Sequence, residues 1–373
     1  MERVIISGIG VEIPPTAISN EELVACFNAW ASDENARRAA KNLPALPLSD
    51  AAFIEHASGI RQRHVLFPEG VLDPRRMTPK IPERDDDELS VQAEFGCRAA
   101  RAALGEAGLD GGAIDMVICS TSHPQRLYPA VAIEIQSALE ARGAAFDMNL
   151  GCASAAAALH LAFSLVRSGA QRRVLVVTPE IITGHLDFRD RQTHFIFGDA
   201  AVAVVVEAWN GMSDQSGRFE VLNTAVWTEF SNNIRTNFGY LQRAAQDDTS
   251  ALRMEGKLIK QQGNRVFKEV SMGVHRVIDE FLQANGLGVE GIRRFWLHQA
   301  NARMNAMILK LALGQEADQD RAPTVLERVG NTAAAGAVIA LHENRHDLQT
   351  GDLGVLCAFG AGYSIGAGLL RKL

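Results

Sequence analysis

The sequence predicts an α/β protein built from two similar halves in series. Continuous apolar runs over residues 114–120 and 173–178 alternate with helical patterns, which is typical of layered folds whose sheets are covered on both faces. Asn, Gly, Ser and Asp gather in residues 208–218, and the same alternation starts again after them. We therefore predict an N-terminal half over residues 1–208 and a C-terminal half over residues 209–373.

The first half begins with an apolar, β-branched run over residues 3–8, which favours a strand. Ser19 and Glu22 have the spacing of a capping box, which predicts a helix over residues 23–30. Two proline-containing stretches are predicted to be irregular insertions: 31–48 and 67–86. The further predicted elements are helices over 49–58, 87–109, 131–139 and after Cys152, and strands over 114–120, 146–150, 173–178 and 200–206.

The second half repeats this style with four predicted strands and three predicted helices. The strands cover residues 219–227, 294–297, 353–358 and 363–370, and the helices cover 264–285, 302–313 and 331–346.

Charge, hydropathy and cysteine spacing argue against several classes of function. The net charge of −7 argues against a nucleic-acid binder. No apolar run approaches the roughly 18 residues of a membrane span, and the N-terminus has no signal-peptide pattern, so we predict no membrane insertion. The five cysteines lie far apart without a CxxC pair, which is typical of reduced thiols and predicts a cytoplasmic protein.

Cys152 is the first candidate for chemistry. The surrounding residues predict a strand ending near Leu150, a tight turn at Gly151 and a helix that Cys152 opens. The positive end of a helix dipole favours an anion, so we expect the pKa of this thiol to be lowered and the thiol to be a nucleophile. The alternative is a buried cysteine that packs as a small hydrophobic side chain.

Three further features could work with this thiol. His298 ends a predicted buried strand in the run Trp-Leu-His-Gln-Ala-Asn, where α/β proteins often place functional side chains, although a core histidine is the alternative. Asn331 lies in a Gly-Asn-Thr turn before an alanine-rich helix, and a simple N-cap is the alternative. The glycine-rich residues 359–366 could present backbone N–H groups to an oxyanion, and they could equally form a tight hairpin.

Taken in this order, the cysteine at a helix start, His-Gln-Ala-Asn, Gly-Asn-Thr and the Gly-x-Gly turn resemble the thiolase-fold condensing enzymes, and among them β-ketoacyl-acyl carrier protein synthase III. The likeness runs along nearly the whole chain and includes Ser58-Gly-Ile-Arg61, Tyr128-Pro129, Asp190-Arg191, Phe197-Gly-Asp199 and Asn264-Arg-Val-Phe-Lys268. The resemblance implies a thiolase-like fold of two similar α/β halves in a layered αβαβα arrangement. It also implies a homodimeric acyltransferase without a cofactor or metal.

The resemblance also implies roles for individual residues. Cys152 would attack an acyl thioester and carry the acyl group, while the backbone N–H groups of Cys152 and Ala361 hold the oxyanion. His298 and Asn331 would donate hydrogen bonds to a malonyl thioester carbonyl and stabilise the enolate left by decarboxylation. This enolate would attack the acyl-cysteine, which joins an acyl-CoA primer to malonyl-acyl carrier protein.

Substrate and partner contacts follow from the same resemblance. Arg191 matches the residue that stacks on the adenine of coenzyme A, whereas Phe53 and Ala57 replace a tryptophan and an arginine beside it. Tyr128 matches a pocket residue that is reached across the dimer interface. The remaining expected contacts are Asn264 and Asn301 for substrate, and Lys268 and Arg303 in a basic patch for the acidic carrier protein.

The extra stretches at 31–48 and 67–86 lengthen the chain relative to the common form of the family and could reshape the acyl tunnel. Ser154 also replaces a glycine found two residues after the family's cysteine. With these two stretches, the chain is more similar to the family's subgroup primed by medium-chain acyl-CoA, such as octanoyl-CoA, than to the acetyl-primed subgroup.

Three alternatives remain open. The same residues could serve a condensing enzyme of secondary metabolism or a same-fold acyltransferase, or the chain could be an inactive partner subunit. His342, Glu343 and His346 also fit the H-E-x-x-H pattern of zinc hydrolases, although no His or Glu follows them as a third ligand.

Overall fold

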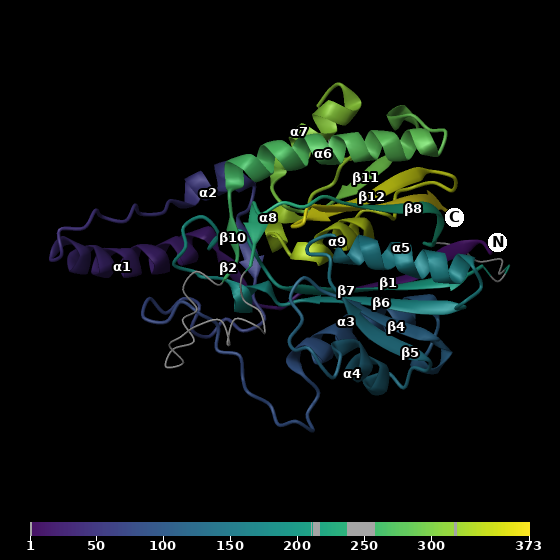
Figure 1. Ribbon diagram of the computed structural model, residues 1–373, viewed down its shortest axis with the longest axis horizontal. Coiled ribbons are helices and arrows are strands. Elements are labelled where there is room, and N and C mark those ends of the chain that lie inside the picture. The colour runs from purple at the N-terminus through teal and green to yellow at the C-terminus, as the bar shows by residue number, and fades with distance from the viewer. Residues whose placement is uncertain (1, 210, 212–216, 237–257, 317–318) are drawn as a thin grey trace.

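The structure is a computed structural model that describes residues 2–209, 211, 217–236, 258–316 and 319–373. Its elements fall into two series with a similar order, in which β5 of the first series has no counterpart in the second (Figure 1). The first series is β1 (Val4–Glu12), α3 (Val91–Ala107), β4 (Met116–Ser120), α4 (Val131–Ala138), β5 (Ala144–Met148), α5 (Ser154–Arg167), β6 (Arg173–Glu180) and β7 (Ala200–Ala208). The second series is β8 (Phe219–Thr228), α6 (Gly263–Ala284), β11 (Arg294–Leu297), α7 (Ala302–Leu313), α9 (Gly336–Glu343), β12 (Leu353–Gly360) and β13 (Ser364–Lys372).

Strand pairing repeats as well. In the first series β4 pairs parallel with β6, and β6, β7 and β1 follow as antiparallel neighbours. In the second series β11 pairs parallel with β12, and β12, β13 and β8 follow in the same antiparallel manner. A short β1–β8 pairing joins both sets into one hydrogen-bonded sheet of order β11-β12-β13-β8-β1-β7-β6-β4-β5.

The helices form three layers around these strands (Figure 1). Helix α5 packs against β6 and β7 of one series and against β8 and β13 of the other, so it lies between the two sets of strands. Helix α9 contacts β11, β12 and β1 in the same central layer, while α3 and α6 cover the outer faces. Separate apolar clusters fill each interface, which confirms the predicted αβαβα layering. The proposed boundary at residue 208 lies beside residues outside the described ones and stays a prediction.

The short elements mostly surround one end of this layered body. They are β2 (Ala17–Ser19), α1 (Asn20–Ala39), α2 (Ala51–Ser58), β3 (Gln62–His64), β9 (Ile234–Arg235), β10 (Lys260–Gln261) and α8 (Leu326–Val329), with 3₁₀ turns η1 (Gly111–Ala113), η2 (Ile182–His185), η4 (Val289–Gly291) and η5 (Ala333–Ala335). No described helix is long and apolar enough to cross a membrane.

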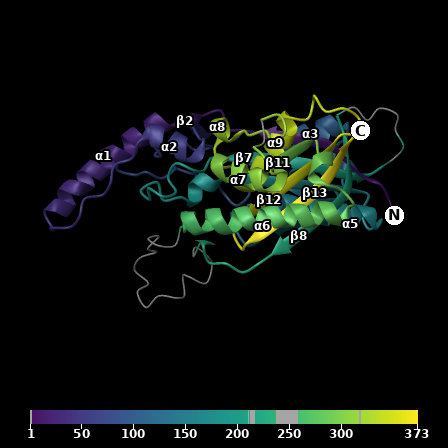
Figure 2. The same cartoon turned by 90° about the horizontal axis from the view of Figure 1, so that it is seen from above.

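Helix α1 corrects one prediction. The capping box forms as expected, because Glu22 N donates to Ser19 Oγ at 3.2 Å and Ser19 N donates to Glu22 Oε2 at 2.9 Å. The helix then continues to Ala39 instead of ending at residue 30. Residues 31–39 contain no proline or glycine, and they are polar because this part of α1 projects away from the body into solvent (Figure 2). The second predicted insertion, over residues 67–86, is irregular as expected.

Candidate active site

The three predicted catalytic side chains meet at one cavity. Cys152, His298 and Asn331 all line a cavity of about 640 Å³ where the ends of several core elements converge. They come from three places: the turn before α5, the end of β11 and the turn before η5. Residues separated by up to 179 positions in the sequence, from Cys152 to Asn331, are therefore brought to a common space by the layered fold.

The turn that carries Cys152 is held by Ser154. Gly151 has φ +56°, which is the left-handed conformation that glycine adopts without strain. Ser154 Oγ donates to Gly151 O at 2.7 Å and accepts from Leu150 N at 2.8 Å. Helix α5 begins at Ser154, so Cys152 lies two residues before the helix and does not open it. The serine at the family's glycine position thus fixes the nucleophile turn.

The glycine-rich turn packs directly on this cysteine. Ser364 Oγ lies 2.9 Å from Leu150 O and 2.8 Å from Ala361 O, so one hydroxyl links the two turns. A Cβ on Gly151 would lie 3.4 Å from Ala361 O, which places Ala361 beside the Cys152 turn. This proximity supports the predicted pairing of the Cys152 and Ala361 N–H groups in an oxyanion hole.

Gly360 offers a test of this close contact. A Cβ at residue 360 would lie 2.7 Å from Cys152 Cβ and 2.9 Å from Cys152 N, so Gly360→Ala must displace the nucleophile. We expect a destabilisation of about 1–3 kcal/mol and loss of most Cys152 acylation, measured by chemical unfolding and intact mass. Gly105→Ala is the matched control, because nothing lies within 4 Å of the added Cβ. Normal acylation of Gly360→Ala would contradict the described contact.

His298 is buried and neutral. Its backbone N–H donates to Cys357 O at 2.8 Å, and its ring packs edge-on against Phe359 with 5.2 Å between centroids. Burial lowers the pKa of the imidazole to about 4, so the ring carries no charge above about pH 5. Within the described residues, Nδ1 has no hydrogen-bond partner. A neutral imidazole in a cavity wall can donate a hydrogen bond without readily giving up a proton.

Asn331 is oriented by its own turn. Its N–H donates to Ile196 O at 2.9 Å and its carbonyl accepts from Gly198 N at 3.1 Å. Its Oδ1 accepts from Ala333 N at 2.9 Å, which leaves the amide NH₂ as the group that can donate to a ligand. This side-chain bond partly supports the N-cap alternative. The helix predicted over residues 331–346 forms only over Gly336–Glu343, because a 3₁₀ turn precedes α9 and Ala333 adopts φ +47°.

The expected effect on the Cys152 thiol is also wrong in direction. Burial, followed by the nearby carboxylate of Glu180, raises the pKa of Cys152 to about 12. The sequence pattern suggested a helix N-terminus, but the helix starts two residues later, and the partly buried thiol experiences desolvation and the charge of Glu180. The thiol is therefore protonated at neutral pH and must lose its proton as it attacks.

Arg191 and Phe53 form one wall near the cavity mouth. The Arg191 guanidinium lies over the Phe53 ring, 5.8 Å from its centroid, and both residues line the cavity together with Asn264. Phe53 is 55% exposed, so its ring is available to a ligand. A planar cation and an aromatic face in this arrangement can stack with a flat heterocycle.

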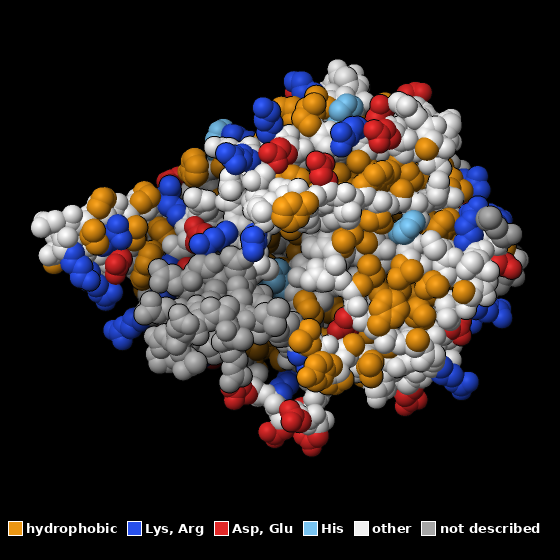
Figure 3. All heavy atoms as spheres, in the orientation of Figure 1, with side chains coloured by type: hydrophobic (Ala, Val, Ile, Leu, Met, Phe, Trp, Pro, Cys, Tyr) orange, Lys and Arg blue, Asp and Glu red, His pale blue; other side chains and the backbone are white. Residues whose placement is uncertain are grey.

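The other predicted contact residues occupy different positions. Asn301 lines the cavity, but its side chain is used in the fold: Nδ2 donates to Ala57 O at 3.0 Å, and Oδ1 caps α7. Arg303 is exposed at the same cavity and contacts His56, and Lys268 is exposed on α6. Tyr128 is 83% exposed and does not line this cavity. Along the upper edge of Figure 3, cations and carboxylates intermingle over α6.

The zinc-hydrolase pattern does not form. Helix α9 ends at Glu343, so His342 and His346 are not one turn apart on a helix. Glu343 pairs with Arg328, and His342 Nδ1 lies 3.1 Å from Arg345 Nη2. Across the described parts of the chain, no three His, Cys, Asp or Glu side chains are grouped as metal ligands.

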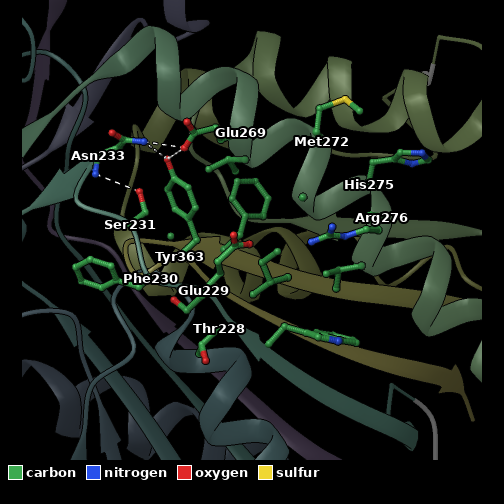
Figure 4. A pocket seen from close by; sticks show the side chains of 18 of the residues that line it. Thr228, Glu229, Phe230, Ser231, Asn233, Glu269, Met272, His275, Arg276 and Tyr363 are labelled. Atoms are coloured by element: carbon green, nitrogen blue, oxygen red, sulfur yellow. Dashed lines mark hydrogen bonds between the residues drawn. The ribbon is translucent and has the colours of Figure 1, made fainter.

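A second cavity of about 790 Å³ adjoins the first (Figure 4). It lies between α6, the end of β8 and the β12–β13 turn, and shares Val270, Phe359 and Gly360 with the catalytic cavity. Tyr363 Oη donates to Glu269 Oε2 at 2.9 Å, and Asn233 Nδ2 donates to the same oxygen at 2.7 Å. Cys152, His298 and Asn331 do not line it, so we assign the chemistry to the smaller cavity.

A cysteine, a neutral histidine and an asparagine around one cavity of a duplicated αβαβα fold define a thiolase-fold condensing enzyme. Comparisons with known proteins agree. The family model of 3-oxoacyl-[acyl-carrier-protein] synthase III matches residues 146–225, and the model of its C-terminal part matches residues 282–372.

Relatives cover nearly the whole chain. A β-ketodecanoyl-[acyl-carrier-protein] synthase of Pseudomonas aeruginosa is 48% identical over 91% of this chain and 97% of its own. A β-ketoacyl-[acyl-carrier-protein] synthase III of Chelativorans sp. is 32% identical over the full length of both chains. The chain thus belongs to the 3-oxoacyl-[acyl-carrier-protein] synthase III family and is an acyltransferase.

Solved structures of related enzymes have the same fold as this chain. The 3-oxoacyl-[acyl-carrier-protein] synthase III of Aquifex aeolicus is 26% identical with a TM-score of 0.75, and the alignment covers 99% of both chains. The priming β-ketosynthase of the R1128 polyketide pathway is 26% identical with a TM-score of 0.77, covering 99% of this chain and 97% of that one.

Sequence reasoning missed several residues that build the site. Ser364 links the two turns, Phe359 packs on His298, and Glu180 is buried behind the Asn331 turn. Gln299 Oε1 accepts from Thr324 Oγ1 and Val325 N at 2.8 and 3.0 Å, which ties the His298 segment to the chain before α8. Ser364 and Phe359 lie within the glycine-rich stretch and could have been found there. Glu180 ends an apolar strand and gave no local signal.

Proposed function

We propose that this protein condenses a medium-chain acyl-CoA primer with malonyl-acyl carrier protein, giving a 3-oxoacyl-acyl carrier protein for fatty acid synthesis. The observation that carries the proposal is the meeting of Cys152, His298 and Asn331 at one cavity whose mouth is lined by Arg191 and Phe53. A thiol provides the acyl carrier, two neutral donors stabilise an enolate, and the stacked cation and ring suit an adenine.

The reaction divides into two steps at this cavity. Cys152 Sγ attacks the primer thioester, its proton leaves with the departing coenzyme A thiol, and the acyl group stays on sulfur. Malonyl thioester then loses CO₂, and the N–H groups of His298 and Asn331 stabilise the enolate oxygen. The enolate carbon attacks the acyl-cysteine, and the Cys152 and Ala361 N–H groups hold the second oxyanion until the C–S bond breaks and the Cys152 thiolate leaves, taking up a proton from solvent. Neutral donors suit this role because an imidazolium would protonate the enolate.

A primer of about eight carbons fits the comparison with the P. aeruginosa relative. That protein is named for a β-ketodecanoyl product, and ten carbons correspond to an eight-carbon primer extended by the two carbons that malonyl retains. The second cavity beside Gly360 offers further room next to the acyl-cysteine.

The expected partners are acyl carrier protein and a second copy of this chain, in the cytoplasm. Arg303 at the cavity and exposed Lys268 on α6 support docking of an acidic carrier, although the chain as a whole is acidic. Two observations support a homodimer: β5 is the edge strand of the nine-stranded sheet, and Tyr128 is exposed away from its own cavity.

Acylation by competing primers tests the proposal. The protein is incubated with equimolar acetyl-, butyryl-, octanoyl- and decanoyl-CoA, and adducts are resolved by intact mass. We expect one octanoyl adduct to dominate, and Arg191→Ala to slow its formation about tenfold through weaker coenzyme A binding. Dominance of the acetyl adduct would contradict the medium-chain assignment.

A second candidate keeps the chemistry and changes the pathway. The likeness to a priming β-ketosynthase of polyketide synthesis supports a condensing enzyme of secondary metabolism. Supplying the malonyl group on the carrier protein of fatty acid synthesis or on a polyketide carrier protein distinguishes the two, because the preferred carrier gives the higher rate of product formation.

A further inference from the structure

Glu180 is a buried acid with neutral partners only. It is the last residue of β6 and is fully buried. Its carboxylate accepts from Ser122 N at 2.9 Å, Ser122 Oγ at 2.8 Å, Thr121 Oγ1 at 3.0 Å and Ala334 N at 3.3 Å. Within the described parts of the chain it forms no ion pair. Burying a carboxylate without a cation is costly, so stability alone does not account for a glutamate at this position.

The four donors come from segments that surround the active site. Thr121 and Ser122 follow β4, and Ala334 lies three residues after Asn331 in η5. Ala333 N is bonded to Asn331 Oδ1, and the next amide, Ala334 N, is bonded to Glu180. These two successive bonds hold a turn in which Ala333 has the uncommon φ of +47°. Glu180 therefore fixes the backbone that orients the Asn331 amide.

The same carboxylate acts on Cys152 through its charge. It is the charged group that raises the pKa of the thiol after burial itself. His123 is linked to Glu180 through Ser122, and His185 stacks on His123 with 4.4 Å between centroids. Burial lowers the pKa of both rings to about 3 and about 4, so neither offsets the negative charge at neutral pH. The thiol of Cys119 on β4 also interacts with the charge of Glu180, which contributes to its raised pKa after burial and Asp147.

We propose that Glu180 is a positioning residue of the condensing site, whose buried carboxyl group holds the Asn331 turn through Ala334. This inference rests on the function proposed above. Glu180 does not touch the reacting atoms, so its influence on condensation passes through the turn.

Two variants separate charge from geometry. Glu180→Gln keeps the length and removes the charge, and Glu180→Asp keeps the charge and shortens the side chain. The first readout is the pH dependence of Cys152 alkylation by iodoacetamide, which requires no substrate. We expect Glu180→Gln to be alkylated at least threefold faster than wild type at pH 8, and Glu180→Asp to stay within twofold of wild type.

The second readout is turnover with octanoyl-CoA and malonyl-acyl carrier protein. We expect Glu180→Asp to lose at least tenfold in kcat while KM for the malonyl substrate changes less than threefold, because the shorter side chain withdraws from Ala334 N and the Asn331 donor is misplaced. Glu207→Gln is the control, since Glu207 pairs with Arg173 at the other end of the β6–β7 pair and should leave both readouts unchanged.

Folding is checked by thermal unfolding. Burial raises the pKa of Glu180 to about 7, so the folded wild type keeps a proton that the unfolded chain loses at lower pH. Wild type therefore loses stability relative to Glu180→Gln as the pH rises from about 5 to 8, and the difference in Tm should move in favour of the variant.

If Glu180→Gln does not fold, Ser122→Ala and Thr121→Val each remove one donor, and each should lower kcat at least threefold. Wild-type turnover in all folded variants would overturn the proposed positioning role while leaving the proposed function intact. An inactive wild type would refute the proposed function itself, and unchanged alkylation in Glu180→Gln would show that the charge of Glu180 does not reach the thiol.

Discussion

Cys152→Ala is expected to form no acyl adduct and to lose at least about 10⁴-fold in turnover, because the acyl group then has no sulfur to occupy. The effect should be on chemistry and not on folding, since the side chain is small and partly accessible at the cavity wall. Intact mass after incubation with octanoyl-CoA measures the adduct, and the rate of coenzyme A release measures turnover.

The chain offers a matched control for this experiment. Cys97 is a free, buried cysteine in α3, and burial raises the pKa of its thiol to about 11. Cys97→Ala should retain a single adduct of full intensity. An adduct that persists in Cys152→Ala would mean that another group carries the acyl chain, and the assignment of the nucleophile would be wrong.

His298→Ala is expected to separate the two half-reactions. Cys152 remains, so octanoyl transfer from coenzyme A should continue and an acyl-enzyme should accumulate. Loss of one hydrogen-bond donor to the enolate should reduce condensation about 10²- to 10³-fold. Quenched-flow measurement of the acyl-enzyme and of CO₂ release distinguishes the steps, and His346→Ala, outside the cavity, serves as the control.

The pH dependence of this step follows from the state of the imidazole. The folded-state pKa of His298 is lowered to about 4, so the neutral form is present above that value and is lost as the pH falls through it. Condensation should therefore show no ionisation of His298 between pH 5.5 and 8. A rate that falls through a pKa near 6.5 in wild type but not in His298→Ala would show that the ring is solvated and that the described burial is wrong.

Much of the fold could be predicted because its strands are buried on both faces and read as continuous apolar runs. Residues 173–178 and 353–358 are examples, and both lie within observed strands. Helix ends were harder to place. The polar second half of α1 has no apolar face because it projects from the body, and the turn after Asn331 depends on bonds from Ala333 and Ala334 to distant or non-helical groups.

The meeting of Cys152, His298 and Asn331 could be anticipated from local motifs and from their order in the family. The state of the thiol could not, because it depends on burial and on Glu180, 28 positions away in the sequence. Asn301 is a residue for which the family motif predicted too much. The motif suggested substrate binding, whereas both polar groups of the side chain are used to cap α7 and to contact α2. Such roles are decided by tertiary contacts that a local pattern does not contain.

The most direct test of decarboxylative condensation at Cys152 is the mass of the carrier protein after reaction. Malonyl-acyl carrier protein and octanoyl-CoA are incubated with the enzyme, and the carrier is measured by intact mass beside a Cys152→Ala reaction. A carrier bearing a 3-oxodecanoyl group, absent with the variant, is the predicted result. A carrier that bears an octanoyl group without loss of CO₂ would contradict condensation and identify a simple acyl transfer.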